Sequence, residues 1–341
     1  MIEPELAEPL EAAEPAELHG ADRADVAMLV TSRADGALFH SRFRELGRFL
    51  RPGDLLVVNT SATLPAALPA HLGGEEITLH LSTPVDGGHW VVELRTAERR
   101  PFRAARSGAR LELPGGARVE LLAPYLGSDR LFVARLSLGE PVESYLHRHG
   151  HPIRYGHTPD EWPIDAYQTV FALHPGSVEM PSAARPFTAA LVAELVAQGV
   201  LFAPLTLHAG VSSLELGESP YPERYRVPPS TARLVNAVHE WGGRVIGVGT
   251  TVVRALETVA DADGVVRTGE GLTNLVVTPE RGLRAIDGLL TGWHDSHSSH
   301  LQLLEASAGR ELLRQSYRAA AARGYRLHEF GDSHLILPQA R

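Results

Sequence analysis

The hydrophobic residues of this chain follow different patterns in different stretches. Leu55-Leu56-Val57-Val58 is a run of four apolar residues after a Pro-Gly-Asp turn, and a short apolar run bounded by turn residues predicts a buried strand. From Ile77 to Leu138, short alternating segments are separated by Gly-Gly, Pro-Gly and Gly-Ser turns. Closely spaced short strands of this kind predict a small antiparallel barrel or sandwich.

Helical periodicity becomes regular after residue 188. Between Thr188 and Gln198 the apolar residues recur on one helical face, Thr188 is a suitable N-cap, and Gly199 follows the last turn. The helices expected after it are 231–241, 251–260 and 301–322, the last as one or two helices around Gly309, and the expected strands are 201–208, 244–248 and 274–278. Strands that alternate with helices predict a mixed α/β domain.

The first 20 residues carry six Glu, three Pro and no Arg, which predicts a disordered acidic tail at 1–20. A secretory signal needs a basic start followed by an apolar run, so this segment does not resemble one. No stretch approaches the roughly 18 apolar residues of a membrane span. We therefore expect a soluble, cytoplasmic protein without a membrane partner, and the sequence gives no indication of its oligomeric state.

Composition narrows the chemistry that the chain can perform. All 32 basic residues are Arg, and there is no Lys and no Cys. Without Lys the protein cannot form a Schiff base or supply the Lys of a phosphate-binding P-loop. Without Cys it has no disulfide, no thiolate nucleophile and no Cys-ligated zinc or iron–sulfur cluster. Catalysis must use His, Asp, Glu, Tyr, Ser, Thr, Arg and backbone groups.

The charge of the chain is unevenly distributed. The formal net charge of −9 becomes −3 without the six Glu of the tail, so the remaining chain is nearly neutral. Seven Arg lie between Arg95 and Arg118, against Glu98 and Glu112. This stretch is either the solvated edge of a small sheet or a surface that contacts RNA phosphates.

The segment from Arg244 to Glu257 has the pattern of a strand, a Gly-x-Gly turn and an amphipathic helix that begins at Thr250 or Thr251. The free N–H groups and the dipole of such a helix start can bind a carboxylate or phosphate. Val252 occupies the position where a dinucleotide-binding fingerprint needs its third Gly. The alternative is a tight turn with a threonine cap.

Two groups of closely spaced histidines are candidates for metal ligands, but we expect neither to form a metal site. His294, His297 and His300 are spaced at i, i+3 and i+6, so on a helix the third would point about 240° away from the first. A Ser-rich turn before a helix explains the same composition. The second group lies in a stretch expected to be an exposed loop and consists of His147, His149, His151 and His157. We expect no metal site.

His208 follows an apolar strand, and Glu223 and Tyr225 follow in a Pro-rich segment. A histidine at a strand end can act as a general acid or base, and a nearby Glu or Tyr can orient it. The alternative is a histidine that is only hydrogen-bonded.

Seven short motifs occur between about residues 50 and 337. They are Pro52-Gly-Asp-Leu-Leu-Val-Val-Asn59, Tyr167-Gln-Thr-Val170, Thr206-Leu-His208 with Gly210, Glu223 with Tyr225, Val248-Gly-Thr-Thr-Val-Val-Arg254 with Leu256-Glu257, Asp287-Gly-Leu-Leu-Thr291 with His294, and Tyr325-Arg326 with Phe330-Gly-Asp332. In combination they resemble one family, the S-adenosylmethionine:tRNA ribosyltransferase-isomerases of queuosine synthesis.

The resemblance implies an α/β (α+β) fold in which a small antiparallel β-barrel domain is inserted into a larger, discontinuous, barrel-like α/β domain. On this basis the chain divides into the acidic tail at 1–20, the main domain at 21–68 and 146–341, and the inserted barrel at 69–145.

The resemblance also implies the reaction. The ribosyl part of S-adenosylmethionine would be transferred to the 7-aminomethyl-7-deazaguanine of tRNA and isomerised to give epoxyqueuosine, with release of methionine and adenine. The sulfonium acidifies the adjacent carbon, so S-adenosylmethionine is a substrate and neither Lys, Cys nor a metal is required. The tRNA would contact the surface between Arg95 and Arg118.

The resemblance assigns roles to residues of the matching motifs. His208 would transfer protons, with Glu223 and Tyr225 in support. Residues expected to bind substrate are Thr250, Thr251 and Arg254 for the anionic or ribose parts of the donor, Gln168, Asp287 and Asp332 for the pocket lining, and the motif residues Glu257 and His294.

Several polar residues of the family pattern are replaced in this chain. The family's motif His is Pro186, the Arg before Tyr-Gln is Ala166, and the His before Glu-x-Tyr is Tyr221. Two alternatives therefore stay open: a diverged enzyme that uses S-adenosylmethionine with a small-molecule acceptor or as a lyase, and a non-catalytic module that binds S-adenosylmethionine or RNA.

Overall fold

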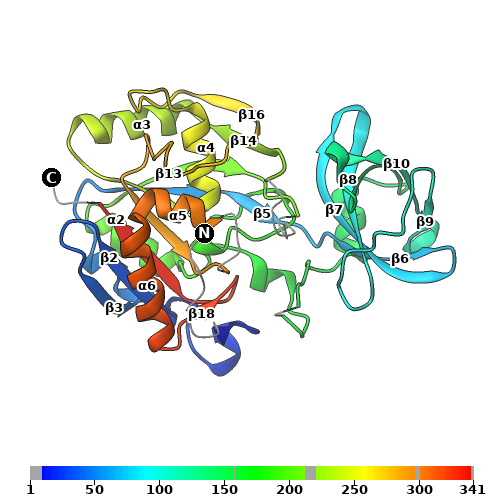
Figure 1. Cartoon of the computed structure of the whole chain (residues 1–341), viewed down its shortest axis with the longest axis horizontal. Helices are drawn as coiled ribbons and strands as arrows, with labels where there is room; N and C mark the ends of the chain where they lie inside the picture. Colours follow the sequence, from blue (N-terminus) through cyan, green and yellow to red (C-terminus); the bar gives the residue numbers. More distant parts are fainter. Residues whose placement is uncertain (1–9, 157, 212–219, 296–299, 339–341) are drawn as a thin grey trace.

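The computed structural model describes residues 10–156, 158–211, 220–295 and 300–338. They form two bodies, a larger one that contains a mixed sheet with helices and a smaller β-barrel beside it (Figure 1). The large sheet has nine strands, in the spatial order β16 (Gly269–Thr273), β14 (Glu223–Val227), β13 (Leu201–Leu207), β4 (Leu55–Asn59), β15 (Val245–Val248), β17 (Gly288–Gly292), β19 (Ser333–Leu337), β2 (Ala27–Ser32) and β3 (Leu38–Arg42). Its edge strands are β16 and β3.

The centre of this sheet is parallel. Strands β13, β4, β15 and β17 are neighbours that run in one direction, with Leu201 opposite Leu55, Leu55 opposite Val245, and Ile246 opposite Gly288. Their carboxyl ends therefore lie along one edge, which is where open α/β sheets place their ligands.

Helices cover both faces of the sheet, as a central parallel strand requires. The helices of the larger body are α2 (Ala189–Ala197), α3 (Pro229–Glu240), α4 (Thr250–Val259), α5 (His300–Ala308) and α6 (Arg310–Ala322). Leu55 and Val57 of β4 belong to a core with α3, α4, α5 and α6, whereas Leu56 and Val58 belong to a core with α2 on the other face. The continuous apolar run in the sequence thus reflects a strand that is buried on both sides.

The smaller body is a closed barrel of six antiparallel strands. Around the barrel they are β10 (Arg118–Pro124), β11 (Leu131–Ser137), β8 (His89–Arg95), β7 (Glu75–Val85), β6 (Ala67–Leu72) and β9 (Arg110–Glu112). Helix α1 (Val142–His149) follows and adds Tyr145 and Leu146 to the barrel core. The predicted fold class, a mixed α/β fold with a small antiparallel barrel, is confirmed.

Two short parallel pairs complete the sheets. Strand β5 (Ser61–Thr63) pairs with β12 (His174–Ser177), directly after β4. Strand β1 (Leu10–Glu11) pairs with β18 (Arg326–Leu327). None of the helices in the described ranges is long and apolar enough to cross a membrane.

The predicted disordered tail is wrong for its second half. Residues 1–9 lie outside the described residues, but Ala12 is buried and the carboxylate of Glu17 binds the buried guanidinium of Arg185. The acidic composition of the segment cannot show that Glu17 neutralises a buried arginine 168 positions away.

One predicted element also differs from the structure. The strand expected at 274–278 is irregular, and the edge strand β16 lies just before it. The stretch 301–322, expected as one or two helices around Gly309, is two helices, because Gly309 has a φ of 79°, a conformation that glycine adopts without strain.

Candidate active site

Polar residues stand at the carboxyl ends of the parallel strands, and Asn59 connects them. This buried side chain ends β4; its Nδ2 donates to the carbonyl of Leu207 at 2.8 Å and to Oγ1 of Thr251 at 3.2 Å, and its Oδ1 accepts from the N–H of Leu207 at 3.0 Å. One amide therefore ties β4 to the end of β13 and to the first turn of α4. Sequence reasoning placed Asn59 in a motif without giving it this role.

His208 follows β13 and is held by two serines. Its Nδ1 lies 2.7 Å from Oγ of Ser61, which lies 2.7 Å from Oγ of Ser177, and the N–H of Ala209 donates to Ser177 at 3.0 Å. Each hydroxyl can donate or accept, so the pair accommodates either neutral tautomer of the imidazole. His208 can therefore present Nε2 as a proton acceptor or as a donor.

The imidazole of His208 packs directly on the backbone of Gly176. A Cβ at residue 176 would lie 2.5 Å from Nδ1 of His208, and Gly176 has a φ of 152°, so a side chain there would be both strained and in collision. Burial, together with the positive charges of His174 and Arg224, lowers the pKa of His208 below its ordinary value. His208 is therefore neutral at pH 7.

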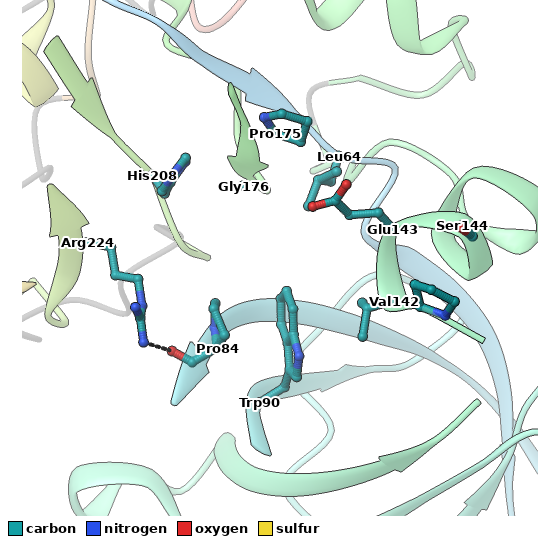
Figure 2. Close-up of a pocket in the computed structure, with 11 residues that line it drawn as sticks. Leu64, Pro84, Trp90, Val142, Glu143, Ser144, Pro175, Gly176, His208 and Arg224 are labelled. Carbon is teal, nitrogen blue, oxygen red and sulfur yellow. Dashed lines mark hydrogen bonds between the residues drawn. The ribbon is translucent and has the colours of Figure 1, made fainter. Parts of the chain in front are cut away.

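A cleft of about 480 Å³ separates the barrel from the larger body, and His208 lines it (Figure 2). The residues that line it are Leu64, Pro84, Trp90, Pro141, Val142, Glu143, Ser144, Pro175, Gly176, His208 and Arg224. Sequence reasoning found only His208 among them. No sequence motif marks the other lining residues, because the cleft forms between segments that are far apart in the chain. The barrel and α1 supply one wall, and the larger body supplies the other.

Glu223 and Arg254 bind each other rather than facing the cleft. Arg254 of α4 donates through Nη1 to Oε2 of Glu223 and through Nε to the carbonyl of Leu275 at 3.1 Å. Oε1 of Glu223 accepts from the N–H of Gly210 at 3.1 Å, two residues after His208. Tyr225, two residues along β14, packs against the core that contains α3 and α4. Glu223 thus positions the turn that follows His208.

The first turn of α4 lies at the same edge of the sheet. Gly249 has a φ of 96° and turns the chain from β15 into the helix, and no side chain caps the first turn. Thr250 is buried and Thr251 binds Asn59. Ala183, from the segment that contains Pro186, would contact a Cβ at Gly249 at 3.4 Å. A helix start of this kind can hold an anionic group.

Four other predicted binding residues bind the protein itself. Oε1 of Gln168 accepts from the N–H of Thr63 at 3.0 Å and its Nε2 donates to the Thr63 carbonyl at 2.8 Å. Asp332 accepts from the N–H groups of Ala27 and Arg326, and burial raises its pKa. Glu257 accepts from the N–H groups of residues 284 and 285 and from the guanidinium of residue 281. Asp287 precedes β17 and binds the N–H of Val245 at 2.9 Å.

Asp287 lies away from His208 and from the first turn of α4. It stands at the amino end of β17, whereas His208, Asn59 and Thr251 stand beyond the carboxyl ends of the parallel strands. The two ends of one sheet cannot line the same pocket. Asp287 therefore has a structural role at the amino end of β17. Thr291, in the same motif, stands at the carboxyl end of the strand, the edge that carries His208.

The histidine groups have separate surroundings. His294 stacks on His300 at 4.5 Å and lies 3.2 Å from Oγ1 of Thr291, and burial lowers the pKa of both rings, that of His300 to about 4. His297 and His157 lie outside the described residues. His147 and His149 belong to α1 rather than to the expected loop. Within the described ranges, no group of three or more acidic or histidine residues is arranged to hold a metal ion.

Most of the Arg side chains between 95 and 118 are engaged within the protein. Arg95 is buried and binds Glu93 at 2.7 Å, and Arg99 donates to carbonyls of residues 155, 158 and 159. Arg103 pairs with Asp129, while Arg100 and Arg118 are exposed. The stretch therefore combines arginines that stabilise the barrel with arginines at its surface, and the exposed ones are Arg100, Arg103, Arg106, Arg110 and Arg118.

Comparison with known proteins identifies one group of relatives. The family model described as queuosine biosynthesis protein matches residues 3–336. Two proteins named S-adenosylmethionine:tRNA ribosyltransferase-isomerase are each 38% identical to the chain: that of Symbiobacterium thermophilum, with 98% of both chains aligned, and that of Moorella thermoacetica, with 91% of this chain and 92% of the relative aligned. The crystal structure of S-adenosylmethionine tRNA ribosyltransferase from Thermotoga maritima superimposes with a TM-score of 0.54, at 29% identity, over 98% of both chains.

Proposed function

This chain belongs to the queuosine biosynthesis protein family, and we propose that it catalyses the S-adenosylmethionine:tRNA ribosyltransferase-isomerase reaction. The observation that carries the proposal is the 38% identity to an enzyme of that name over 98% of both chains. Both bodies are included in that alignment, so the relatives have counterparts of both walls of the cleft.

The reaction requires three contributions from the protein. A base must remove a proton from the carbon next to the sulfonium of S-adenosylmethionine, and an acid must protonate the departing adenine. The acceptor, 7-aminomethyl-7-deazaguanine in tRNA, must be held so that its amine captures the rearranging sugar. Orientation and proton transfer account for such a reaction without a protein nucleophile.

His208 is the proton-transfer residue. Its lowered pKa keeps it neutral, and Ser61 and Ser177 accommodate either tautomer. A group that first accepts and later donates a proton benefits from this freedom, because each step needs a different protonation state of Nε2. Glu223 supports His208 by holding the N–H of Gly210.

The first turn of α4 binds the anionic part of the donor. The N–H groups at residues 250 and 251 are at the positive end of the helix, and a carboxylate is the group they favour. Thr251 is joined through Asn59 to Leu207, directly before His208, so donor and proton carrier share one rigid edge. Arg254, Gln168, Asp332 and His294 shape this edge through the contacts described above, and Glu257 anchors the far end of α4.

The test is nucleoside analysis of the tRNA product. The purified protein is incubated with S-adenosylmethionine and tRNA carrying 7-aminomethyl-7-deazaguanine at the wobble position, and the digested tRNA is examined by mass spectrometry. We expect epoxyqueuosine, together with free methionine and adenine, and no product from tRNA with guanine at that position. Adenine release without tRNA would indicate a lyase or another acceptor, and binding of S-adenosylmethionine without turnover would indicate a binding module.

A further inference from the structure

The wall of the cleft opposite His208 belongs to the barrel and to α1, and the proposal above gives it no role. Trp90 lies on β8 and Glu143 in the first turn of α1. Figure 2 shows Trp90 across the cleft from Gly176 and His208, with the Glu143 carboxylate beside Leu64. Both side chains line the same cleft as His208.

Trp90 and its neighbours form a slot suited to a flat ring. The indole is partly buried, and Pro84 and Val142 lie on the same wall. The opposite wall offers Pro175 and Gly176, whose α-carbon packs against the imidazole of His208. Aromatic side chains in such slots bind planar heterocycles by stacking, largely independently of the identity of the base.

Glu143 adds a negative charge to this slot. Among the described residues, no side chain or backbone group forms a hydrogen bond or ion pair with its carboxylate, although the nearby Glu140 pairs with Arg148 at 3.1 Å. Arg224 lies at the other end of the cleft, where it donates to the carbonyl of Pro84 at 3.4 Å. The charge of Glu143 is therefore available to a cationic group of a ligand.

We propose that this slot is the acceptor subsite, with the base stacked on Trp90 and its primary ammonium bound by Glu143. The proposal rests on the proposed function, whose acceptor is a planar base with an aminomethyl group. The cleft suits a base attached to a polymer, because Pro141, Ser144 and Pro175 at its rim are exposed. In the proposed function the donor binds elsewhere, at the first turn of α4, so the slot is free for the acceptor.

Steady-state kinetics separate the two substrates. In Glu143→Gln we expect KM for the acceptor tRNA to rise by about 10- to 100-fold, the loss expected for one charge-assisted hydrogen bond, with KM for S-adenosylmethionine unchanged. Trp90→Ala should show the same rise in KM for the acceptor tRNA. Trp90→Phe keeps an aromatic ring and should retain most of the affinity for the tRNA. Glu140→Gln, which removes the same charge outside the cleft, is the control. An unchanged KM for tRNA, or a rise only for S-adenosylmethionine, would overturn the proposal.

A binding measurement keeps this proposal separate from the proposed function. Calorimetry with the free bases needs no turnover: the wild-type protein should bind 7-aminomethyl-7-deazaguanine more tightly than 7-cyano-7-deazaguanine, which lacks the ammonium. Glu143→Gln should bind the two bases equally. Equal binding by the wild type, or a preference that survives in Glu143→Gln, would overturn the subsite even if the enzyme is active.

Discussion

The surroundings of His208, the proposed proton-transfer residue, are made by residues distant in the sequence. Ser61 and Ser177 lie 147 and 31 positions from His208 in the sequence, yet both belong to the hydrogen-bonded chain that ends at its Nδ1. Gly176 leaves room for the ring, and Arg224 adds the charge that helps to keep it neutral. A motif can indicate that this histidine matters, but its protonation state follows from these contacts.

The pH dependence of turnover should report His208. A base must be neutral to accept a proton, so kcat/KM should be flat at neutral pH and fall as the pH drops through the pKa of His208. Because burial and positive neighbours lower that pKa, the acidic limb should lie below pH 6.5, the ordinary value. Arg224→Gln removes one of those charges and should move the limb to higher pH.

Arg226→Gln is the matched control for that prediction. It removes the same charge from the same strand, two positions further from His208, and in the described part of the chain Arg226 pairs with the exposed Glu270. Its pH profile should match the wild type. A limb that stays in place in Arg224→Gln would show that another group titrates.

Sequence reasoning found several residues of this region but did not reveal their partners. Glu223 was expected to support His208 and Arg254 to hold the donor, and the structure also pairs them with each other. Residue types and spacing cannot show such a pairing, because it depends on how β14 lies against α4. Both residues still influence the site, through Gly210 and through the placement of the helix.

At the scale of elements, α4 is the helix that the site depends on most, and Glu257 anchors it. Its fully buried carboxylate holds the N–H groups of Arg284 and Ala285 and the guanidinium of Arg281. The loop before β17 is thereby fixed to the end of α4. The first turn of the helix, about two turns away, is held in place through this contact.

Removal of this anchor should destabilise the protein. Glu257→Ala leaves the Arg281 charge and two N–H groups without their acceptor, and we expect the free energy of unfolding to fall by about 3 kcal/mol. Urea unfolding with an unchanged m-value measures the loss. Glu240→Ala, at an exposed position at the end of α3, should change stability by less than about 0.5 kcal/mol. Equal stability of the Glu257 variant and the wild type would contradict this role.

Sequence patterns predicted secondary structure correctly where it depends on residues that are close together in the chain. Thr188 caps α2 as expected, since its side chain accepts from the N–H of Leu191 at 3.1 Å. The expected strand at 274–278 is wrong because an apolar run can be buried without pairing: Val277 is in the core but outside any strand. The segment 10–20 is ordered by tertiary contacts with Arg185 and β18 that its own composition cannot reveal.

At the scale of the whole molecule, the cleft lined by His208 exists only because two bodies meet. The larger body supplies His208 and Arg224, and the barrel with α1 supplies Trp90 and Glu143. The sequence predicted both kinds of body from their hydrophobic patterns, but their relative position depends on contacts between distant segments. For that reason His208 could be named from the sequence while the opposite wall could not.

The most direct test of this account is adenine release from S-adenosylmethionine, measured side by side for the wild-type protein and His208→Ala. With acceptor tRNA present, the wild type should release adenine and the variant should do so at least about 100-fold more slowly. His71→Ala, on an exposed position of the barrel, should match the wild type. Equal adenine release by His208→Ala and the wild type would contradict the claim that His208 in this cleft carries the reaction.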